Sequence, residues 1–237
     1  MFSNSTVILT GVGNEGQVGE VVAKAFADLG ASVVLVDRTA ENVNARVDAL
    51  TKAGAKARGY ACDLSDAAAV DALVKDVRAN HGDAIGAFVH MAGGFAMSGP
   101  VADSDVGVWQ KQIAINLTTA YLAGRAFLPL LRAGKGAMVF FASEAALPGA
   151  SAANRVAYAV AKTGVVTLVR AIAAEEAKAG TGVRANAIAP TSIRTAANVS
   201  AMGGDVRYVE REEVAATVTY LCSPQASAVN GAVIPLS

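Results

Sequence analysis

The sequence predicts an α/β fold in which a parallel sheet is covered by helices on both faces. Short apolar runs alternate with helical patterns from one end of the chain to the other, which is typical of such a sheet. A glycine-rich loop joins the first apolar run to the first helical pattern. The chain has 237 residues, 53% of them hydrophobic, and can therefore bury a sizeable core. We expect one domain over residues 1–237.

The first unit has the order strand, glycine loop, helix that is typical of dinucleotide binding. The apolar run 6–9 precedes Gly11, Gly13 and Gly16, which have the spacing G-x-G-x-x-G, and the helix ends at Gly30. Glycines let the backbone turn tightly and approach a pyrophosphate, whose charge is stabilised at the helix N-terminus. One such match is a weak signal, and its place between a strand and a helix strengthens it.

The second apolar strand, 32–36, ends in Asp37. An acidic residue there is placed to accept hydrogen bonds from the adenosine ribose, although a turn or capping residue is an alternative. Its carboxylate would repel the 2′-phosphate of NADP, so we expect NAD(H) to be preferred. The next residue, Arg38, could pair with that phosphate, which keeps NADP(H) possible.

The remaining elements continue the alternation. Ser65 is expected to cap the third helix, and Pro129 to bend a long fourth helix. Ala92-Gly93-Gly94-Phe95 follows the fourth strand, where a flat ligand could approach the backbone. In chain order we expect a helix at 40–53, a strand at 55–62, a helix to about 80, a strand at 85–91, a helix at 105–131, a strand at 137–142, a helix to about 178, a strand at 183–189, a helix at 212–221 and a strand at 231–236.

The stretch 143–162 carries the clearest chemical pattern. If its end is helical, Tyr158 and Lys162 lie one turn apart on the same face. An ammonium about 4 Å from a phenol favours phenolate, so we expect a lowered pKa for Tyr158 and proton transfer at neutral pH. Ser143 ends the fifth strand and could donate to a substrate carbonyl oxygen. By itself Y-x-x-x-K is common in helices, where a core aromatic beside a solvated lysine is the usual outcome.

Charge and composition exclude several classes of partner. Twenty basic and twenty acidic residues cancel, so we expect neither nucleic acid nor an anionic membrane as a partner. Cys62 and Cys222 are too few for a disulfide framework and lack metal-ligand spacing, so we expect buried thiols and no metal. The start of the chain lacks signal-peptide features, and the weakly charged stretch 85–102 holds four glycines. We expect a cytoplasmic protein.

Taken together, these blocks resemble the short-chain dehydrogenase/reductase family over essentially the whole chain. The resemblance implies a Rossmann fold with a doubly wound, seven-stranded parallel sheet in the order 3-2-1-4-5-6-7. The blocks that agree in order and spacing are Thr10-Gly11 to Gly19, Cys62-Asp63-Leu64, Ala92-Gly93, Ser143 to Lys162, and Val183 to Pro190 with Thr195.

The resemblance also implies roles for matching residues. Tyr158 would be the general acid/base, Ser143 would orient the carbonyl, and Lys162 would bind the ribose and lower the pKa of Tyr158. Asn116 would hold a water in a proton relay. The residues implied to bind the cofactor are Gly11, Gly13, Gly16, Val18, Asp37, Arg38, Asp63, Leu64, Ala92, Gly93, Tyr158, Lys162, Pro190 and Ile193.

Several positions depart from the family pattern. The glycine loop is two residues longer, so Gly13, Asn14 and Gly16 all remain candidates for phosphate contact. His90 replaces an asparagine of the family motif and is expected to be a satisfied scaffold residue. Two extra residues between Ser143 and Tyr158 should form a bulge at the mouth of the site. Pro190-Thr191-Ser192-Ile193, the short lid 195–211 and the stretch 92–95 are similar to the dihydropteridine-reductase-like branch.

The implied activity is NAD(P)(H)-dependent hydride transfer between nicotinamide and a carbonyl or secondary alcohol. Alternatives are a 3-oxoacyl-thioester (acyl-carrier-protein) reductase and a non-catalytic dinucleotide-binding scaffold. A methyltransferase would share the glycine loop but has no use for Tyr158 and Lys162. The short lid and Phe95 suggest a broad or planar substrate, for which a quinonoid pterin is one candidate.

We expect the chain to bind copies of itself, as a tetramer by resemblance to the family. The segment 157–169 carries only Lys162 as a charge, and 113–123 carries none. Both are apolar on more faces than one sheet can cover. Burial under the short lid is the alternative.

Overall fold

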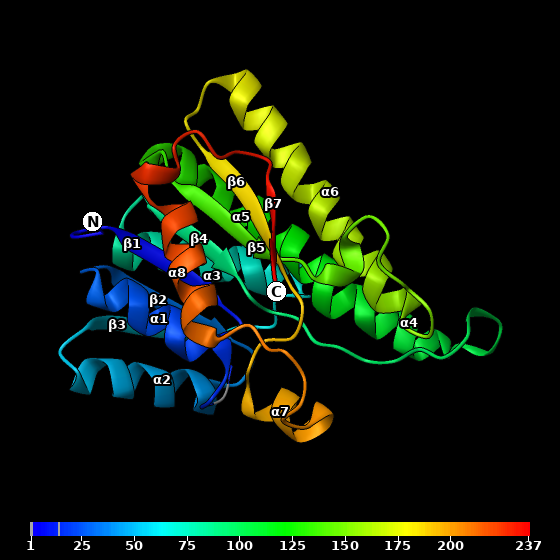
Figure 1. Ribbon diagram of the computed structural model, residues 1–237. Coiled ribbons are helices and arrows are strands. Elements are labelled where there is room, and N and C mark those ends of the chain that lie inside the picture. Colours follow the sequence, from blue (N-terminus) through cyan, green and yellow to red (C-terminus); the bar gives the residue numbers. More distant parts are fainter. Residues whose placement is uncertain (1, 14) are drawn as a thin grey trace.

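Seven strands form one parallel sheet in the order β3-β2-β1-β4-β5-β6-β7, as predicted (Figure 1). The computed structural model describes residues 2–13 and 15–237, so the candidate Asn14 lies outside the described residues. The strand order reverses between β1 and β4, and ligands of such sheets bind at the carboxyl ends of the strands beside this point. The strands are β1 (Thr6–Thr10), β2 (Ser32–Asp37), β3 (Lys56–Ala61), β4 (Ala87–His90), β5 (Ala137–Phe141), β6 (Arg184–Pro190) and β7 (Val233–Leu236).

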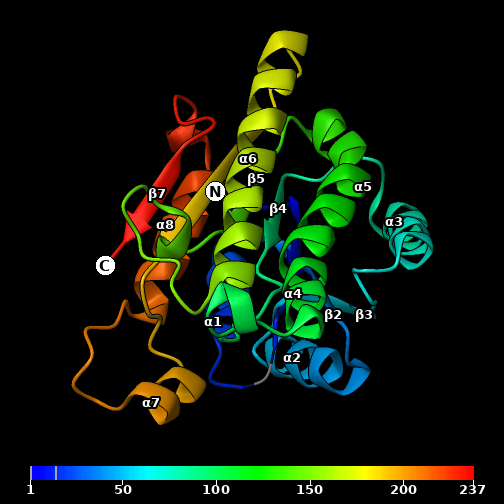
Figure 2. The ribbon, with the colours of Figure 1, turned by 90° about the vertical axis from the view of Figure 1, so that its right-hand side faces the viewer.

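Helices cover both faces of the sheet. α1, α2 and α8 lie on one face, and α3, α5 and α6 on the other (Figures 1 and 2). α4 continues the line of α5, and α7 lies apart from both layers, at the lower edge of both views. The helices are α1 (Val18–Asp28), α2 (Ala40–Lys52), α3 (Ala67–His81), α4 (Val106–Ile113), α5 (Thr119–Gly134), α6 (Val156–Ala179), α7 (Ala196–Met202) and α8 (Arg211–Cys222).

The central strands are apolar along their whole length because both of their faces are covered. In β2, Val34 and Val36 pack toward α3 and α5, while Val33 and Leu35 pack toward α1 and α8. Burying such a side chain contributes about 1.5–3 kcal/mol. The continuous apolar runs in the sequence therefore predict these strands well.

Three local expectations differ from the structure. Asp66, not Ser65, caps α3, because its carboxylate accepts from the backbone N–H of Ala68 at 2.8 Å while the Ser65 hydroxyl donates to Asp63. The long helix is interrupted by a π turn, Ala114–Thr118, whereas Pro129 lies inside α5 without ending it. The short helix α7 was not expected, since its seven residues carry too little apolar periodicity to predict it.

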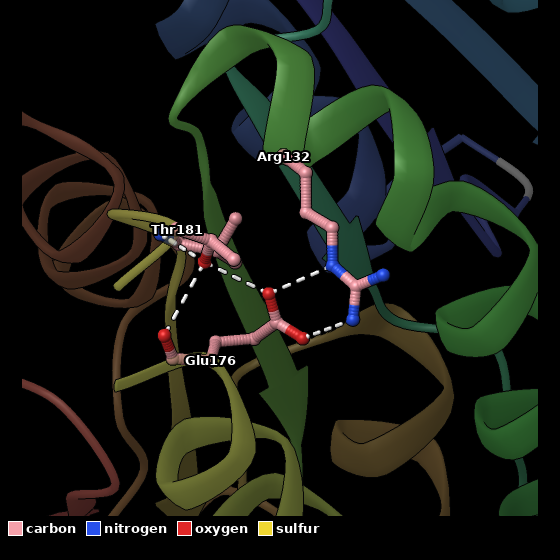
Figure 3. Close-up of polar contacts among 4 residues, drawn as sticks. Arg132, Glu176 and Thr181 are labelled. Carbon is pink, nitrogen blue, oxygen red and sulfur yellow. Dashed lines mark hydrogen bonds and ion pairs between the residues drawn. The ribbon is translucent and has the colours of Figure 1, made fainter. Parts of the chain in front are cut away.

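A buried carboxylate joins three elements at the amino ends of β5 and β6 (Figure 3). The Arg132 guanidinium at the end of α5 donates twice to Glu176 of α6, at 2.9 and 2.6 Å. The Thr181 hydroxyl, in the turn before β6, donates to the same carboxylate at 2.8 Å. Arg132 and Thr181 hold the pKa of Glu176 below its usual range. This contact lies at the edge of the sheet opposite the glycine loop.

Replacing Glu176 with Gln should lower the free energy of unfolding by about 2–3 kcal/mol, because the buried amide would face the donors of Arg132. A carboxyl with a lowered folded pKa stabilises above its unfolded pKa, and this contribution is lost as the pH falls through the folded value. The gap between wild type and variant should therefore shrink below about pH 4. Urea unfolding measures it, with the exposed neighbour Glu175→Gln as control. Equal losses in both variants would contradict the assignment.

Candidate active site

A cavity of about 410 Å³ opens at the carboxyl ends of the strands, where the strand order reverses. Nine of the fourteen predicted cofactor residues line it, whereas Gly16, Tyr158, Lys162, Pro190 and Ile193 do not. The predicted residues in its lining are Gly11, Gly13, Val18, Asp37, Arg38, Asp63, Leu64, Ala92 and Gly93. The lining also contains residues that were not predicted to bind the cofactor: Gln17, Gly19, Cys62, Ser65, Met91, Lys111, Ile115 and Thr119.

Two glycines of the loop allow neighbouring backbone segments to approach each other closely, as a dinucleotide site requires. Gly11 has φ +72°, and any side chain there would overlap the backbone of Ala92. A side chain on Gly19 would overlap Val12 in the same way. These two positions therefore require glycine. They bring the loop after β1, the N-terminus of α1 and the loop after β4 to the wall of one cavity, where a pyrophosphate would meet backbone N–H groups.

Two carboxylates hold the lengthened loop. Asp37 at the end of β2 accepts from the N–H of Gly13 at 2.9 Å, and Glu20 in α1 accepts from the N–H of Gly16 at 2.8 Å. Glu20 also pairs with Arg46 of α2 at 2.9 Å and lies 3.7 Å from Arg211 of α8. The loop is thus fixed from four elements. Glu20 was missed because its partners on α2 and α8 are remote in sequence.

Ser143, Tyr158 and Lys162 meet where β5 ends and α6 begins. The buried Lys162 ammonium, 5% exposed, donates to the carbonyl of Phe141 at 2.7 Å. Its nitrogen lies 5.8 Å from the centroid of the Tyr158 ring. Ser143 is buried beside the phenol, and its hydroxyl oxygen accepts from the N–H of Ala145 at 3.3 Å. One hydroxyl, one phenol and one ammonium are therefore brought together.

The pKa of Tyr158 is raised, contrary to the expectation from the sequence. Burial raises the pKa of the phenol more than the Ser143 hydroxyl and the Arg155 guanidinium lower it, and Glu144 adds to the rise. The Lys162 ammonium donates to the Phe141 carbonyl and is not among the main causes of this shift in the pKa of Tyr158. Burial also lowers the pKa of Lys162 itself to about 8. Helical spacing fixes which groups share a face, but not where a flexible lysine points.

Asn116 lies in the π turn and holds the loop after β4. Its side-chain oxygen accepts from the Gly94 N–H at 3.1 Å, and its amide nitrogen donates to the Gly94 carbonyl at 2.9 Å and to Gln112 at 3.1 Å. A side chain on Gly93 would collide with the Asn116 amide and lie in contact with Lys162. The amide of Asn116 therefore positions the cavity wall. Its expected role in holding a water stays a prediction.

His90 is a satisfied scaffold residue, as expected. Thr119 donates to the carbonyl of Ile115 at 2.8 Å, which assigns the His90 Nε2–H as donor to the Thr119 hydroxyl at 3.3 Å. The other ring nitrogen then accepts from Thr10 at 2.9 Å. Burial lowers the pKa of His90 to about 3, so the ring is neutral. A neutral imidazole whose two nitrogens are both hydrogen-bonded is not available as a catalyst.

The mouth of the site is partly aromatic. Phe95 meets Tyr158 edge to face with the ring centroids 5.1 Å apart, and 57% of its surface is exposed. Met97 and Met202, from the same loop and from α7, are also exposed. One apolar ring thus packs on the phenol and is itself open to solvent.

Within residues 2–13 and 15–237, no group of three or more His, Cys, Asp or Glu side chains could hold a metal ion. By length and composition alone, α6 could cross a membrane. It contacts β6 and packs its apolar side chains into the core, as a core helix of this fold does. Burial raises the pKa of both thiols, Cys62 to about 11 and Cys222 to about 12.

Known proteins resemble this chain in sequence and in fold. Residues 11–237 match the family described as enoyl-(acyl carrier protein) reductase. D-threitol dehydrogenase of Mycolicibacterium smegmatis is 35% identical over 227 residues, covering 91% of this chain and 85% of that protein. The levodione reductase structure has a TM-score of 0.89 and 31% identity, and the match covers 100% and 97% of the two chains. A candidate NAD(P)-dependent gluconate 5-dehydrogenase from Beutenbergia cavernae, solved with NADP at low occupancy, has a TM-score of 0.86 and 29% identity, with 98% and 95% covered.

Replacing Lys162 with Met should stabilise the protein while removing the buried charge. A pKa lowered from 10.5 to about 8 costs the folded state about 3 kcal/mol at pH 7, and losing the bond to Phe141 offsets about 1–2 of these. We expect a net gain of about 1–2 kcal/mol in the free energy of unfolding. A cation with a lowered folded pKa destabilises most below that value, so the gain should fall as the pH rises from about 8 to 10.5 and become a loss of about 1–2 kcal/mol, the contribution of the bond to Phe141.

Thermal and urea unfolding between neutral and alkaline pH measure this difference. The exposed Lys178→Met, on the same helix, is the control and should change stability little at any pH. A Lys162→Met protein that is less stable than wild type at pH 7 would contradict the stated cost of burying this ammonium.

Proposed function

This chain belongs to the short-chain dehydrogenase/reductase family, and we propose that Ser143, Tyr158 and Lys162 carry out its reaction. The enzyme is an NAD(P)-dependent oxidoreductase that acts on alcohols or ketones. The observation that supports the assignment of residues is the meeting of a serine hydroxyl, a phenol and a buried ammonium beside the cofactor cavity. The cofactor supplies or accepts the hydride when it is bound.

In the direction of reduction, Tyr158 donates its proton to the substrate oxygen while Ser143 donates a hydrogen bond to the same oxygen. The raised pKa keeps the phenol protonated at neutral pH, which suits a proton donor. Oxidation needs the phenolate and is therefore favoured by alkaline pH. Lys162 holds the end of β5 and, as an ammonium below about pH 8, favours negative charge that develops near it.

The cations at the mouth argue for a small substrate rather than an acyl carrier protein. Arg155 is paired with Glu144 at 3.1 Å, and Arg194 with Glu210 at 2.6 Å. Their charge is thus balanced locally and does not form a basic patch for an acidic carrier protein. The joint presence of Asn116 with the three reacting residues argues against a non-catalytic scaffold.

The substrate class follows from the apolar mouth around Phe95 and from the relatives. We propose a small diol, cyclic alcohol or ketone, and a quinonoid pterin remains a candidate. A panel of D-threitol, levodione, a quinonoid pterin and 3-oxoacyl and enoyl thioesters, with NADH or NADPH (or the oxidised forms), tests this through nicotinamide absorbance. Turnover of acyl thioesters alone would favour the carrier-protein alternative.

Replacing Tyr158 with Phe should lower kcat by about 10²–10⁴-fold, because the substrate oxygen loses its proton donor. The Kd for NADH, measured by calorimetry, should stay near the wild-type value. Tyr220→Phe, at an exposed phenol on α8, is the matched control and should leave both quantities unchanged. An unchanged kcat in the Tyr158 variant would overturn the mechanism.

The preference between the two cofactors is proposed from Asp37. Its carboxylate lines the cavity at the end of β2 and is held by Gly13, so a 2′-phosphate would meet a fixed negative charge. The adjacent Arg38 also lines the cavity but is exposed, and ordering its side chain costs entropy. We therefore favour NAD(H), with NADP(H) as a weaker cofactor.

The ratio of kcat/KM for NADH over NADPH should exceed about ten, since like charges at this range repel by more than a kcal/mol. Asp37→Ala should lower the ratio, and Arg38→Ala should raise it. Calorimetric Kd values for both cofactors provide a readout independent of turnover. A wild-type ratio below one would show that Arg38 decides the preference.

Exposed apolar side chains on neighbouring helices support the expected homo-oligomer. Trp109 on α4, Tyr121 on α5 and Val160 on α6 are each at least 40% exposed. A second copy of the chain would cover these helices, and a tetramer is proposed by family. We also propose that residues 1–237 act as one domain and that the enzyme is cytoplasmic.

Light scattering at micromolar concentration should therefore report a mass well above the 23.9 kDa of one chain. Tyr121→Glu should shift the mass toward that of a single chain, because it places a charge in the apolar contact. A wild-type protein that is monomeric under these conditions would contradict the proposal.

A further inference from the structure

An ion pair closes the lengthened loop between Ser143 and Tyr158 at both of its ends. Glu144 directly follows Ser143, and Arg155 precedes Tyr158 by three residues at the start of α6. The guanidinium Nη1 of Arg155 lies 3.1 Å from the Glu144 carboxylate. Its Nε donates to the carbonyl of Ser151 at 3.0 Å, inside the loop. One side chain thus joins the start, the middle and the end of this loop.

The outer part of the loop is fixed as well. Asn154 has φ +60°, a left-handed conformation that costs energy for a residue with a side chain. Its carbonyl accepts from the N–H of Ser98 at 2.7 Å and from that of Gly99 at 3.1 Å. These residues belong to the segment after β4 that also carries Phe95, which packs on Tyr158. The ion pair therefore belongs to a set of contacts that joins the loop before Tyr158 to the segment packed on its ring.

The two partners act on the phenol with opposite sign. Arg155 lowers the pKa of Tyr158, and Glu144 raises it. Both side chains are partly buried, so solvent screens them incompletely. Among the described residues, Lys162 lies one turn along α6 with its nitrogen 5.8 Å from the ring centroid, and the neutral His90 on β4 lies near Lys162. Neither of them balances the loss of one member of the pair.

We propose that Glu144 and Arg155 form a positioning pair, which sets the spacing of Ser143 and Tyr158 around the substrate oxygen and balances the charge beside the phenol. The pair touches neither the reacting atoms nor the cofactor cavity lining, and it acts through the residues that do. The proposal rests on the proposed function of Tyr158.

The test uses Arg155→Gln, Glu144→Gln and the double variant in the full-length enzyme. In the pH profile of kcat for oxidation, the rate rises at alkaline pH as the phenol ionises. Arg155→Gln should move this alkaline limb to higher pH, and Glu144→Gln should move it to lower pH, each by about half a pH unit. At a fixed pH on that limb this is about a threefold change in rate, in opposite directions. The double variant should return near the wild-type limb but with a lower kcat, because the charge is balanced while the loop is released.

A conservative variant and a direct titration separate positioning from general loss of structure. Arg155→Lys keeps the charge but loses the planar contact to Ser151, so its limb should stay in place while kcat falls modestly. Tyrosinate absorbance of the protein without cofactor, with Tyr158→Phe subtracted, should show the same opposite shifts in the pKa of Tyr158. Melting temperatures and the Kd for NADH confirm that each variant is folded.

Single variants that shift the limb in the same direction, or not at all, would overturn the charge balance. A double variant with wild-type kcat would overturn the positioning role. If Tyr158→Phe itself kept its kcat, the proposed function would fail instead, so the two failures are distinguishable.

Discussion

The arrangement of the site depends on one buried ammonium. Lys162 reaches from α6 through the core to the carbonyl at the end of β5, and its nitrogen lies within van der Waals contact of the place that a side chain on Gly93 would take. The Asn116 amide oxygen leaves no room for such a side chain, and both polar atoms of the same amide hold the backbone of Gly94. A charge in a nonpolar interior is costly unless it is hydrogen-bonded. The residues around Lys162 must therefore keep positions that preserve its hydrogen bond.

Burial, more than pairing, sets the protonation states along this edge of the sheet. It keeps the Tyr158 phenol protonated, the His90 ring neutral and the Cys62 thiol unreactive. Arg155 and Glu144 nevertheless act on the phenol with opposite sign, so a displacement of either side chain changes the pKa of Tyr158. Such a site is tuned by distance in a low-dielectric environment rather than by the number of charges.

Much of the fold could be predicted because its signals are local. Apolar runs located the seven strands, and glycine spacing located the cofactor loop. Contacts between segments that are remote in sequence have no local pattern. Glu20 is an example, since its partners lie on α2 and α8. The sequence also does not show which of two neighbouring side chains will cap a helix, and it is Asp66 rather than Ser65 that caps α3. The pKa of Tyr158 is raised mainly by burial of the phenol, which the spacing of Tyr158 and Lys162 does not determine.

The π turn at Ala114–Thr118 has a consequence for the length of the chain. A π turn holds one residue more than the regular helical turn it replaces, so α4 and α5 are out of register by one position. Removing one residue there would restore a regular helical turn and leave α4 and α5 with nearly the same faces toward their neighbours, because the π turn takes up the extra residue locally. The widened turn that directs the Asn116 amide at Gly94 would be lost. Insertions and deletions at this point are thus constrained more strongly than substitutions, even though it lies in the middle of a long helix.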